Sequence, residues 1–174
     1  RDVAAEVLDY LLRDMVAPEG GFYSASDAEN ADGEGNYYLW NLEDLRERLS
    51  TEEAQLLEAH YGFETDAKWQ GRKIPYVRTP LGMVAKKMGR PLLEIKKKLA
   101  GIKRRLLRVR KQRPTPPLDK KILTSWNGLA ISALAKGYQI LSVPAYLNAA
   151  ERAANFILGE TNVKGRLRRN VTDS

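Results

Sequence analysis

The 174-residue sequence contains no cysteine and only one histidine, His60. The absence of thiols excludes disulfides, thiolate metal sites and thiol catalysis, and it fits the cytoplasmic location that we expect. A site built on several histidines is also excluded, and a Ser-His-Asp triad would have to use His60. That residue lies near the predicted end of a helix, where a histidine commonly has a structural role. We therefore expect no metal, no cofactor and no such triad.

A long hydrophobic run is also missing, since no apolar segment approaches the roughly 20 residues that a helix needs to cross a bilayer. We therefore expect no membrane insertion. No signal-peptide pattern occurs at the start, where the first residue is Arg1. A hydrophobic content of 43% and a charged content of 29% are typical of a globular protein. A chain of this length can form one sizeable core, so we predict a single domain over residues 1–174.

The formal net charge of +7 comes from one segment rather than from the whole chain. Residues 96–113 hold ten Lys or Arg and no acid, whereas the rest of the chain has 19 basic and 22 acidic residues. The segment belongs to a predicted helix over residues 91–112, whose apolar residues form one stripe with the cations on the other faces. No aromatic residue lies among the cations, which disfavours stacking on single-stranded nucleic acid. We interpret the segment as a solvated outer helix and do not expect nucleic acid as a partner.

Most of the remaining sequence has helical periodicity, although residues 64–82 are predicted to be irregular. Amphipathic helices are predicted over residues 3–16, 41–49, 50–62 and 144–158. Residues 124–141 differ, because apolar or small side chains surround nearly the whole helix and Lys136 is its only charge. Such a helix is typically buried on all sides. We therefore predict two layers of helices, with this helix more buried than the basic one.

The stretch Gly20–Trp40, GGFYSASDAENADGEGNYYLW, combines aromatic ends with an acidic centre. The aromatic ends predict two short strands that pair as an antiparallel hairpin with a long loop. The loop carries four carboxylates, which repel one another unless cations, basic side chains or backbone donors compensate. These carboxylates belong to Asp27, Glu29, Asp32 and Glu34. The loop is therefore either a polar site or a well-solvated tip.

Calcium is the metal alternative for this loop. Residues 30–35, with the pattern Asn-x-Asp-x-Glu-Gly, match the first half of an EF-hand loop. The twelfth position of that loop is Asn41 instead of the required bidentate glutamate, and no matching helix pair flanks it. We therefore do not predict a calcium site.

A second long motif, LDKKILTSWNGLAISALAKGY, begins at Leu118. Together with Gly20–Trp40 it resembles the thioredoxin domain-containing proteins related to spermatogenesis-associated protein 20. The resemblance implies a mainly α fold, part of an (α/α)6 toroid of the six-hairpin glycosidase type with a small β-hairpin. It also implies that the chain is a fragment, preceded in the parent protein by a thioredoxin-like domain. The chain departs from the family pattern at Glu29, where the family has Asp, and at Lys120, where it has an acid.

The resemblance implies a carbohydrate ligand, and hydrolysis or epimerisation of a sugar in the intact parent, with the fragment itself inactive. Carboxylates serve as general acid and base in such reactions, indole packs on sugar C–H faces, and an amide binds hydroxyls. The catalytic candidates are Asp27 and Glu29, and the substrate-binding candidates are Tyr23, Asp119, Lys121, Trp126 and Asn127.

Three readings of these candidates stay open. In the first, Asp27 or Glu29 lies near Trp126 or Asn127 and forms one polar pocket. In the second, the loop is solvated, the tryptophan belongs to the core, and Asp119 forms only a structural ion pair with Lys121. In the third, the chain is a non-catalytic interaction module on a helical scaffold.

Overall fold

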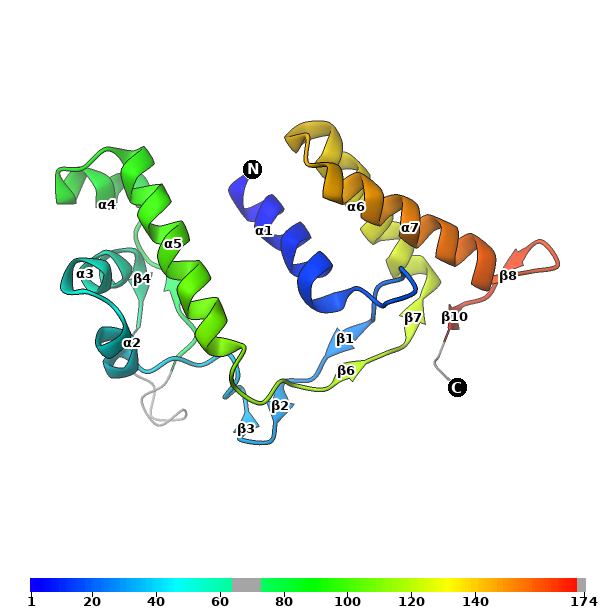
Figure 1. The fold of residues 1–174 in the computed structure, drawn as a ribbon, viewed down its shortest axis with the longest axis horizontal. Helices are drawn as coiled ribbons and strands as arrows, with labels where there is room; N and C mark the ends of the chain where they lie inside the picture. Colours follow the sequence, from blue (N-terminus) through cyan, green and yellow to red (C-terminus); the bar gives the residue numbers. More distant parts are fainter. Residues whose placement is uncertain (64–72, 172–174) are drawn as a thin grey trace. The chain divides into compact units, whose positions relative to one another are not determined.

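The computed structural model describes residues 1–63 and 73–171 (Figure 1). Helices make up more than half of these residues, and each strand in this part is two residues long. The predicted mainly helical fold with short strands is therefore confirmed. None of the described helices has the length and apolarity that crossing a membrane requires. The chain forms two compact units, one from residues 1–27 and 117–174 and the other from residues 28–116.

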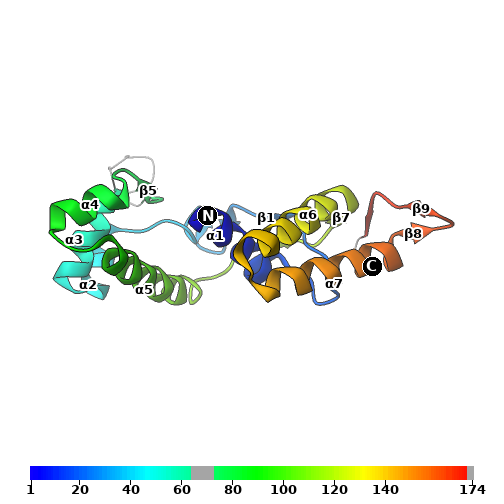
Figure 2. The ribbon, with the colours of Figure 1, turned by 90° about the horizontal axis from the view of Figure 1, so that it is seen from above.

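The first unit is a group of helices extended by short strand pairs. Its helices are α1 (Asp2–Tyr10), the π-helical turn η1 (Leu11–Met15), α6 (Thr124–Leu141) and α7 (Pro144–Glu160). α6 and α7 lie side by side in both views (Figures 1 and 2). α1 packs closely on α6 at Gly137, where an added Cβ would lie 2.4 Å from Leu8 Cδ1. A larger residue at this position would therefore require the Leu8 side chain to shift.

Tyr146 joins α7 to α1. Its hydroxyl donates to the Asp9 carboxylate at 2.8 Å, and the residue is buried. Burial, reinforced by the hydrogen bond to Asp9, raises the pKa of the Tyr146 hydroxyl to about 12, so it stays protonated as a donor at neutral pH. The core beneath this contact consists of Leu8, Met15, Phe22, Leu134, Tyr146, Ala150 and Ala153.

The strands of the first unit pair in antiparallel fashion. They are β1 (Ala25–Ser26) with β6 (Leu118–Asp119), β7 (Ile122–Leu123) with β10 (Asn170–Val171), and β8 (Asn162–Val163) with β9 (Arg166–Leu167). β6 and β7 lie outside residues 20–40, the stretch for which the sequence predicts strands, and were not predicted. These two-residue strands form where neighbouring loops run side by side. Such short pairings need little β-propensity in their residues.

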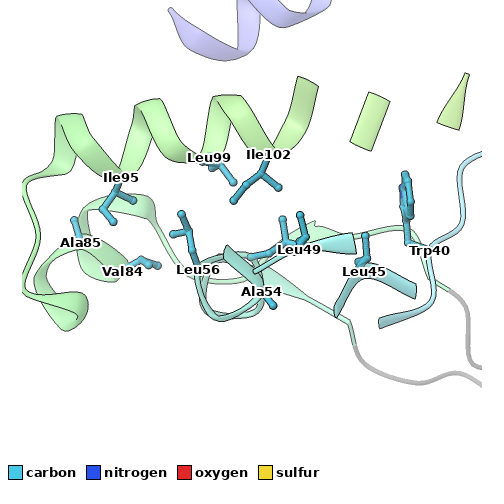
Figure 3. Close-up of a cluster of buried hydrophobic side chains, with 11 residues drawn as sticks. Trp40, Leu45, Leu49, Ala54, Leu56, Val84, Ala85, Ile95, Leu99 and Ile102 are labelled. Carbon is cyan, nitrogen blue, oxygen red and sulfur yellow. The ribbon is translucent and has the colours of Figure 1, made fainter. Parts of the chain in front are cut away.

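The second unit packs three shorter helices against one long one. Its elements are β2 (Glu29–Asn30), β3 (Gly33–Glu34), α2 (Leu42–Arg48), α3 (Thr51–His60), β4 (Tyr61–Gly62), β5 (Tyr76–Val77), α4 (Leu81–Met88) and α5 (Leu92–Arg110). Ile95, Leu99 and Ile102 of α5 point toward Leu56 of α3 and Val84 of α4 (Figure 3). The predicted apolar stripe of the basic helix is confirmed. α4 was not predicted, and residues 64–72 of the segment predicted to be irregular lie outside the described residues.

Side-chain caps define the starts of α2 and α3. The Asn41 side chain accepts the N–H of Glu43, which makes Asn41 the N-cap of α2. At α3, Ser50 Oγ accepts the N–H of Glu53, and the Glu53 carboxylate accepts the N–H of Ser50, which makes a reciprocal capping box. Glu53 Oε2 also lies 2.6 Å from a guanidinium nitrogen of Arg105 on α5. The hydrogen bond from Arg105 and the capping bond from Ser50 lower the pKa of Glu53 from 4.5 to about 2.

We expect Glu53→Gln to lower the free energy of unfolding at pH 7 by about 1–2 kcal/mol, after allowance for the partly exposed arginine. The folded-state pKa lies below the unfolded one, so this contribution is complete above pH 4.5 and is lost as pH falls toward about 2. Urea unfolding of both proteins between pH 7 and pH 3 should show the difference shrinking in this window. Glu47→Gln, which changes an exposed carboxylate, is the control. A difference that stays constant with pH would contradict the ionic origin.

The predicted all-round burial of α6 is wrong. Of its residues only Asn127, Leu134 and Gly137 are buried, while Trp126 is 54% and Leu129 is 70% exposed. α5 also buries three residues, so the predicted difference between the two helices is absent. The physical reason is that α1 and α7 cover one side of α6. Apolar residues all round a helix make its burial favourable, but in the described residues no further helix packs on the remaining side of α6.

The predicted hairpin between the aromatic ends of residues 20–40 is also wrong. Phe22 forms its bridge with Val16, and Trp40 forms one with Lys73. The two aromatic ends are buried in separate clusters, Phe22 in the first unit and Trp40 in the second. The only hairpin in this stretch is β2–β3, inside the acidic loop. The aromatic residues at the two ends therefore pack into two different hydrophobic clusters and do not pair with each other.

Candidate polar site on the first unit

Asn127 connects the two long motifs in the first unit. Its Oδ1 accepts the N–H of Phe22 at 2.7 Å, and its Nδ2 donates to the carbonyl oxygens of Phe22 and Leu123, each at 3.0 Å. Asn127 is only 1% exposed. The amide thus supplies a buried stretch of backbone with the donor and acceptor that it needs. Asn127, which was predicted to bind a sugar, instead forms hydrogen bonds to the protein backbone.

Strands β1 and β6 continue the contact between the motifs. Ala25 pairs with Asp119, and the N–H of Asp27 donates to the carbonyl of Pro117 at 2.8 Å. The N–H of Ser24 donates to the carbonyl of Asp119 at 3.2 Å. Residues 24–27 therefore run antiparallel to residues 117–119, immediately before β7 and the start of α6.

The side chains of Asp27 and Asp119 lie on the same face of this strand pair. Side chains alternate between faces along a strand, and Leu118 packs toward the core of the unit. Ala25, Asp27 and Asp119 are exposed, as expected for the opposite face. Diagonal neighbours of this kind usually have Cα atoms about 7–8 Å apart. Two carboxylates from the two motifs thus share one solvent-facing surface, which we call the β1–β6 face.

Asp119 is held in its ionised form. Its carboxylate accepts the backbone N–H of Lys121 at 3.1 Å and lies 3.3 Å from the Lys121 ammonium. The backbone hydrogen bond from Lys121 lowers the pKa of Asp119 below its usual value, and the ammonium adds to this effect. The predicted ion pair is confirmed. An ionised carboxylate can accept a hydroxyl hydrogen bond or a proton but cannot donate one.

Trp126 and Tyr23 flank this region differently. Trp126 lies in the first turn of α6, three residues after β7, and exposes about half of its surface. Large indole surfaces left in water are typical of binding surfaces. Tyr23 is partly buried against the core cluster, and its backbone N–H donates to the carbonyl of Met15 at 2.9 Å. Trp126 therefore presents more surface to a ligand than Tyr23 does.

The other catalytic candidate, Glu29, belongs to the second unit. It lies opposite Glu34 in the β2–β3 hairpin, a pairing of like charges that is unfavourable. Asn30 is buried and closes the loop: its Oδ1 accepts the N–H of Asp32 at 3.0 Å, and its Nδ2 donates to the carbonyl of Pro114 at 2.6 Å. In residues 1–63 and 73–171, no three His, Cys, Asp or Glu side chains come together in a way that could hold a metal ion.

Arg113 holds the aromatic end of the acidic stretch and was not predicted to do so. One guanidinium nitrogen donates to the carbonyls of Asn36, Tyr37 and Leu39 at 3.1, 3.1 and 2.7 Å. Its guanidinium carbon lies 4.3 Å from the centre of the Trp40 ring, a cation–π contact. No local signal in the sequence distinguishes Arg113 from the other arginines of residues 96–113. The sequence does not indicate the partners, because they lie more than 70 residues away.

We expect Arg113→Gln to lower the free energy of unfolding by about 1–2 kcal/mol, because three carbonyls lose a charged donor. Amide hydrogen exchange over residues 36–40 should accelerate at the same time. The exposed Arg108→Gln on α5 is the matched control and should change stability by less than about 0.5 kcal/mol. Equal effects of the two substitutions would show that Arg113 acts only through net charge.

His60 has a structural position in the second unit. Its side chain is buried, and Nδ1 lies 2.7 Å from the carbonyl oxygen of Thr79. The carbonyl of His60 in turn accepts the N–H groups of Arg78 and Thr79. The ring is thus engaged with backbone after the end of α3, in agreement with the role expected for a histidine near a helix terminus.

The chain is a mainly helical protein in which two long motifs meet through a buried asparagine and a short strand pair. The chain is homologous to spermatogenesis-associated protein 20, with 32% identity to the human protein and 28% to the rat protein over 90% of its length. An uncharacterised protein of Caenorhabditis elegans is 31% identical over 98% of the chain. No protein-family model matches. The chain spans about a quarter of the length of these relatives, 23% of the human protein and 26% of the nematode one.

Proposed function

We propose that the β1–β6 face, together with the indole of Trp126, binds a carbohydrate. The observation that carries this proposal is the strand register, which puts Asp27 and Asp119 on one exposed face although 92 positions separate them. Sugars offer hydroxyl groups to carboxylates and apolar C–H faces to indole. Both kinds of group occur here within one unit of the fold.

In the intact parent protein we propose that this site takes part in glycoside hydrolysis or sugar epimerisation. Both reactions use groups that transfer protons to and from the sugar. Carboxyl groups of glycosidases lie about 5–5.5 Å apart in retaining enzymes and about 6.5–9.5 Å apart in inverting ones. Diagonal neighbours on a strand pair are compatible with either range. Asp119, held ionised by Lys121, is suited to the role of proton acceptor or electrostatic stabiliser.

The rest of the proposal concerns the parent. We infer an (α/α)6 toroid of the six-hairpin type, a preceding thioredoxin-like domain and a cytoplasmic location, as the family resemblance implies. Glu29 stays a catalytic candidate within that larger fold. The toroid would also place further helices beside α6, whose Leu129 and Ile140 are exposed in the described structure.

A non-catalytic interaction module is the second candidate function. It is favoured by the apolar surface of α6, where Trp126, Leu129 and Ile140 are all more than half exposed. On a helix these three positions fall along one stripe. In this reading Trp126 would contact a protein partner instead of a sugar.

Saturation-transfer NMR with neutral hexoses distinguishes the two candidates. We expect transfer to glucose or mannose by the 174-residue chain, and its loss in Asp27→Asn and Asp119→Asn. Glu151→Gln, an exposed carboxylate on α7, is the control and should leave the transfer unchanged. All three variants should melt within a few degrees of the original chain, because surface substitutions change stability little. Absence of transfer with the unmodified 174-residue chain would favour the interaction module.

A further inference from the structure

The positive charge of the protein is confined to the second unit. Residues 28–116 contain 19 basic and 12 acidic residues, a net charge of +7, whereas the first unit contains ten of each. Within the second unit, ten of the cations lie in residues 96–113, on or just after α5. The excess positive charge of the chain therefore lies mainly on and beside α5.

Two cations of α5 are neutralised by carboxylates of α3. Lys98 pairs with Glu52 at 2.5 Å, and Arg105 pairs with Glu53 at 2.6 Å. Arg110 lies over the ring of Tyr37, with its guanidinium carbon 5.3 Å from the ring centre. The two ion pairs offset the charges of Lys98 and Arg105, whereas the ring of Tyr37 holds Arg110 without neutralising it.

A second row of cations has no such neutralisation. All four members are exposed, and none forms an ion pair within the part of the chain that the structure describes. The row consists of Lys97, Arg104, Arg108 and Lys111. Its members fall on the side of the helix opposite the stripe of Ile95, Leu99 and Ile102 that points into the core (Figure 3). We call this row the α5 basic row.

We propose that the α5 basic row is a docking surface for the phosphate backbone of double-stranded nucleic acid. The row runs from Lys97 on α5 (Figure 1) to Lys111, the residue that caps the C-terminus of this helix, and these 14 helical steps correspond to about 21 Å. One strand of a duplex carries a phosphate about every 3.4 Å along its axis, so about six phosphates match this length. The absence of aromatic residues from the row favours a duplex over a single strand, whose bases would need stacking partners. Contacts of this kind do not depend on the base sequence.

The proposal is independent of the carbohydrate site on the other unit. It replaces the sequence interpretation of this helix as merely solvated, from which no nucleic-acid partner was expected. A solvated outer helix normally mixes acids with bases along its exposed face. Here the acids of α3 neutralise one flank, and no acid occurs in residues 96–113. The structure adds that the α5 basic row contains only positive charges and that no carboxylate of the described residues pairs with them.

Fluorescence anisotropy with a labelled 20-base-pair duplex tests the proposal on the full 174-residue chain. Four phosphate contacts predict a slope of about −3.6 for log K against log salt, which is about a 150-fold loss of affinity between 50 and 200 mM salt. Duplexes of unrelated sequence should bind equally. The row is removed by combining Lys97→Gln, Arg104→Gln, Arg108→Gln and Lys111→Gln. This variant should bind about tenfold or more weakly at 50 mM salt and lose most of the slope.

The matched control removes the same number of charges from the first unit. It combines Lys120→Gln, Lys136→Gln, Lys164→Gln and Arg166→Gln, all at exposed positions. The control should keep both affinity and slope. Equal weakening by the two variants would overturn the proposal, as would tighter binding to the single strand or binding only to vesicles that contain anionic lipid.

Circular dichroism shows whether α5 stays folded in the fourfold variant. If that variant unfolds, the single variants Arg104→Gln and Arg108→Gln test the proposal instead, and each should reduce the salt slope by about 0.9.

Discussion

Replacing Asn127 by alanine is expected to lower the free energy of unfolding by about 2–4 kcal/mol. The side chain makes three hydrogen bonds to backbone, and both Asn127 and Phe22 are buried. Without the amide, the N–H and the carbonyl of Phe22 lose their partner where water does not reach, and each unsatisfied group costs about 1–3 kcal/mol. Urea denaturation followed by circular dichroism measures the change.

Gln139→Ala is the matched control for this substitution. It removes an exposed amide from the same helix and should change stability by less than about 0.5 kcal/mol. Asn127→Asp keeps the acceptor for Phe22 but loses both donated bonds, and should therefore also be destabilised. A fully stable Asn127→Ala protein would show that the two motifs are held together by other contacts, and the structural role of Asn127 would be wrong.

The second large effect is expected for Ile102→Ala in the second unit. Ile102 is 1% exposed and packs between α5 and the helices beneath it. Truncation of a buried isoleucine removes apolar contacts and leaves a cavity, and such changes usually cost about 2–5 kcal/mol. Thermal or urea unfolding gives the value.

Leu93→Ala on the same helix is the control for Ile102→Ala. Leu93 is exposed, so its truncation should have an effect below about 0.5 kcal/mol. The contrast tests the orientation of α5, because a helix rotated by half a turn would exchange the two effects. Since the α5 basic row lies opposite Ile102, the same contrast also tests whether that row faces solvent.

Local patterns in the sequence predicted the helices other than α4. The periodicity of residues 124–141 coincides with α6, and the apolar stripe of the basic helix coincides with the buried side of α5. Asn41 caps α2 as its chemistry suggests. These features depend on neighbours within a few residues, which a single sequence contains.

Contacts between distant segments could not be predicted in the same way. The aromatic ends of residues 20–40 are attracted to two different clusters, and nothing within that stretch indicates the division. The exposed side of α6 shows the same limit, since an apolar surface does not specify its neighbour. The partners of Arg113 lie on a segment more than 70 residues away. Each of these depends on the tertiary arrangement rather than on local preference.

The candidate site was partly predictable. The motif residues Asp27, Asp119 and Trp126 were identified from the sequence, and the strand pair explains how the two motifs come together. The role of Asn127 differs from that of a sugar ligand, because a buried amide and an exposed one look identical in a sequence. Glu29 and Asp27 are two residues apart, yet they belong to different compact units.

The most direct test of the β1–β6 face is a set of amide correlation NMR spectra of the chain, recorded during titration with a neutral hexose. We predict shifts in residues 25–27, in residues 119–121 and in the indole N–H of Trp126, with no changes in residues 92–110. Shifts that saturate in these residues together would support one binding site built from both motifs. Unchanged spectra at high sugar concentration, or shifts restricted to the second unit, would contradict it.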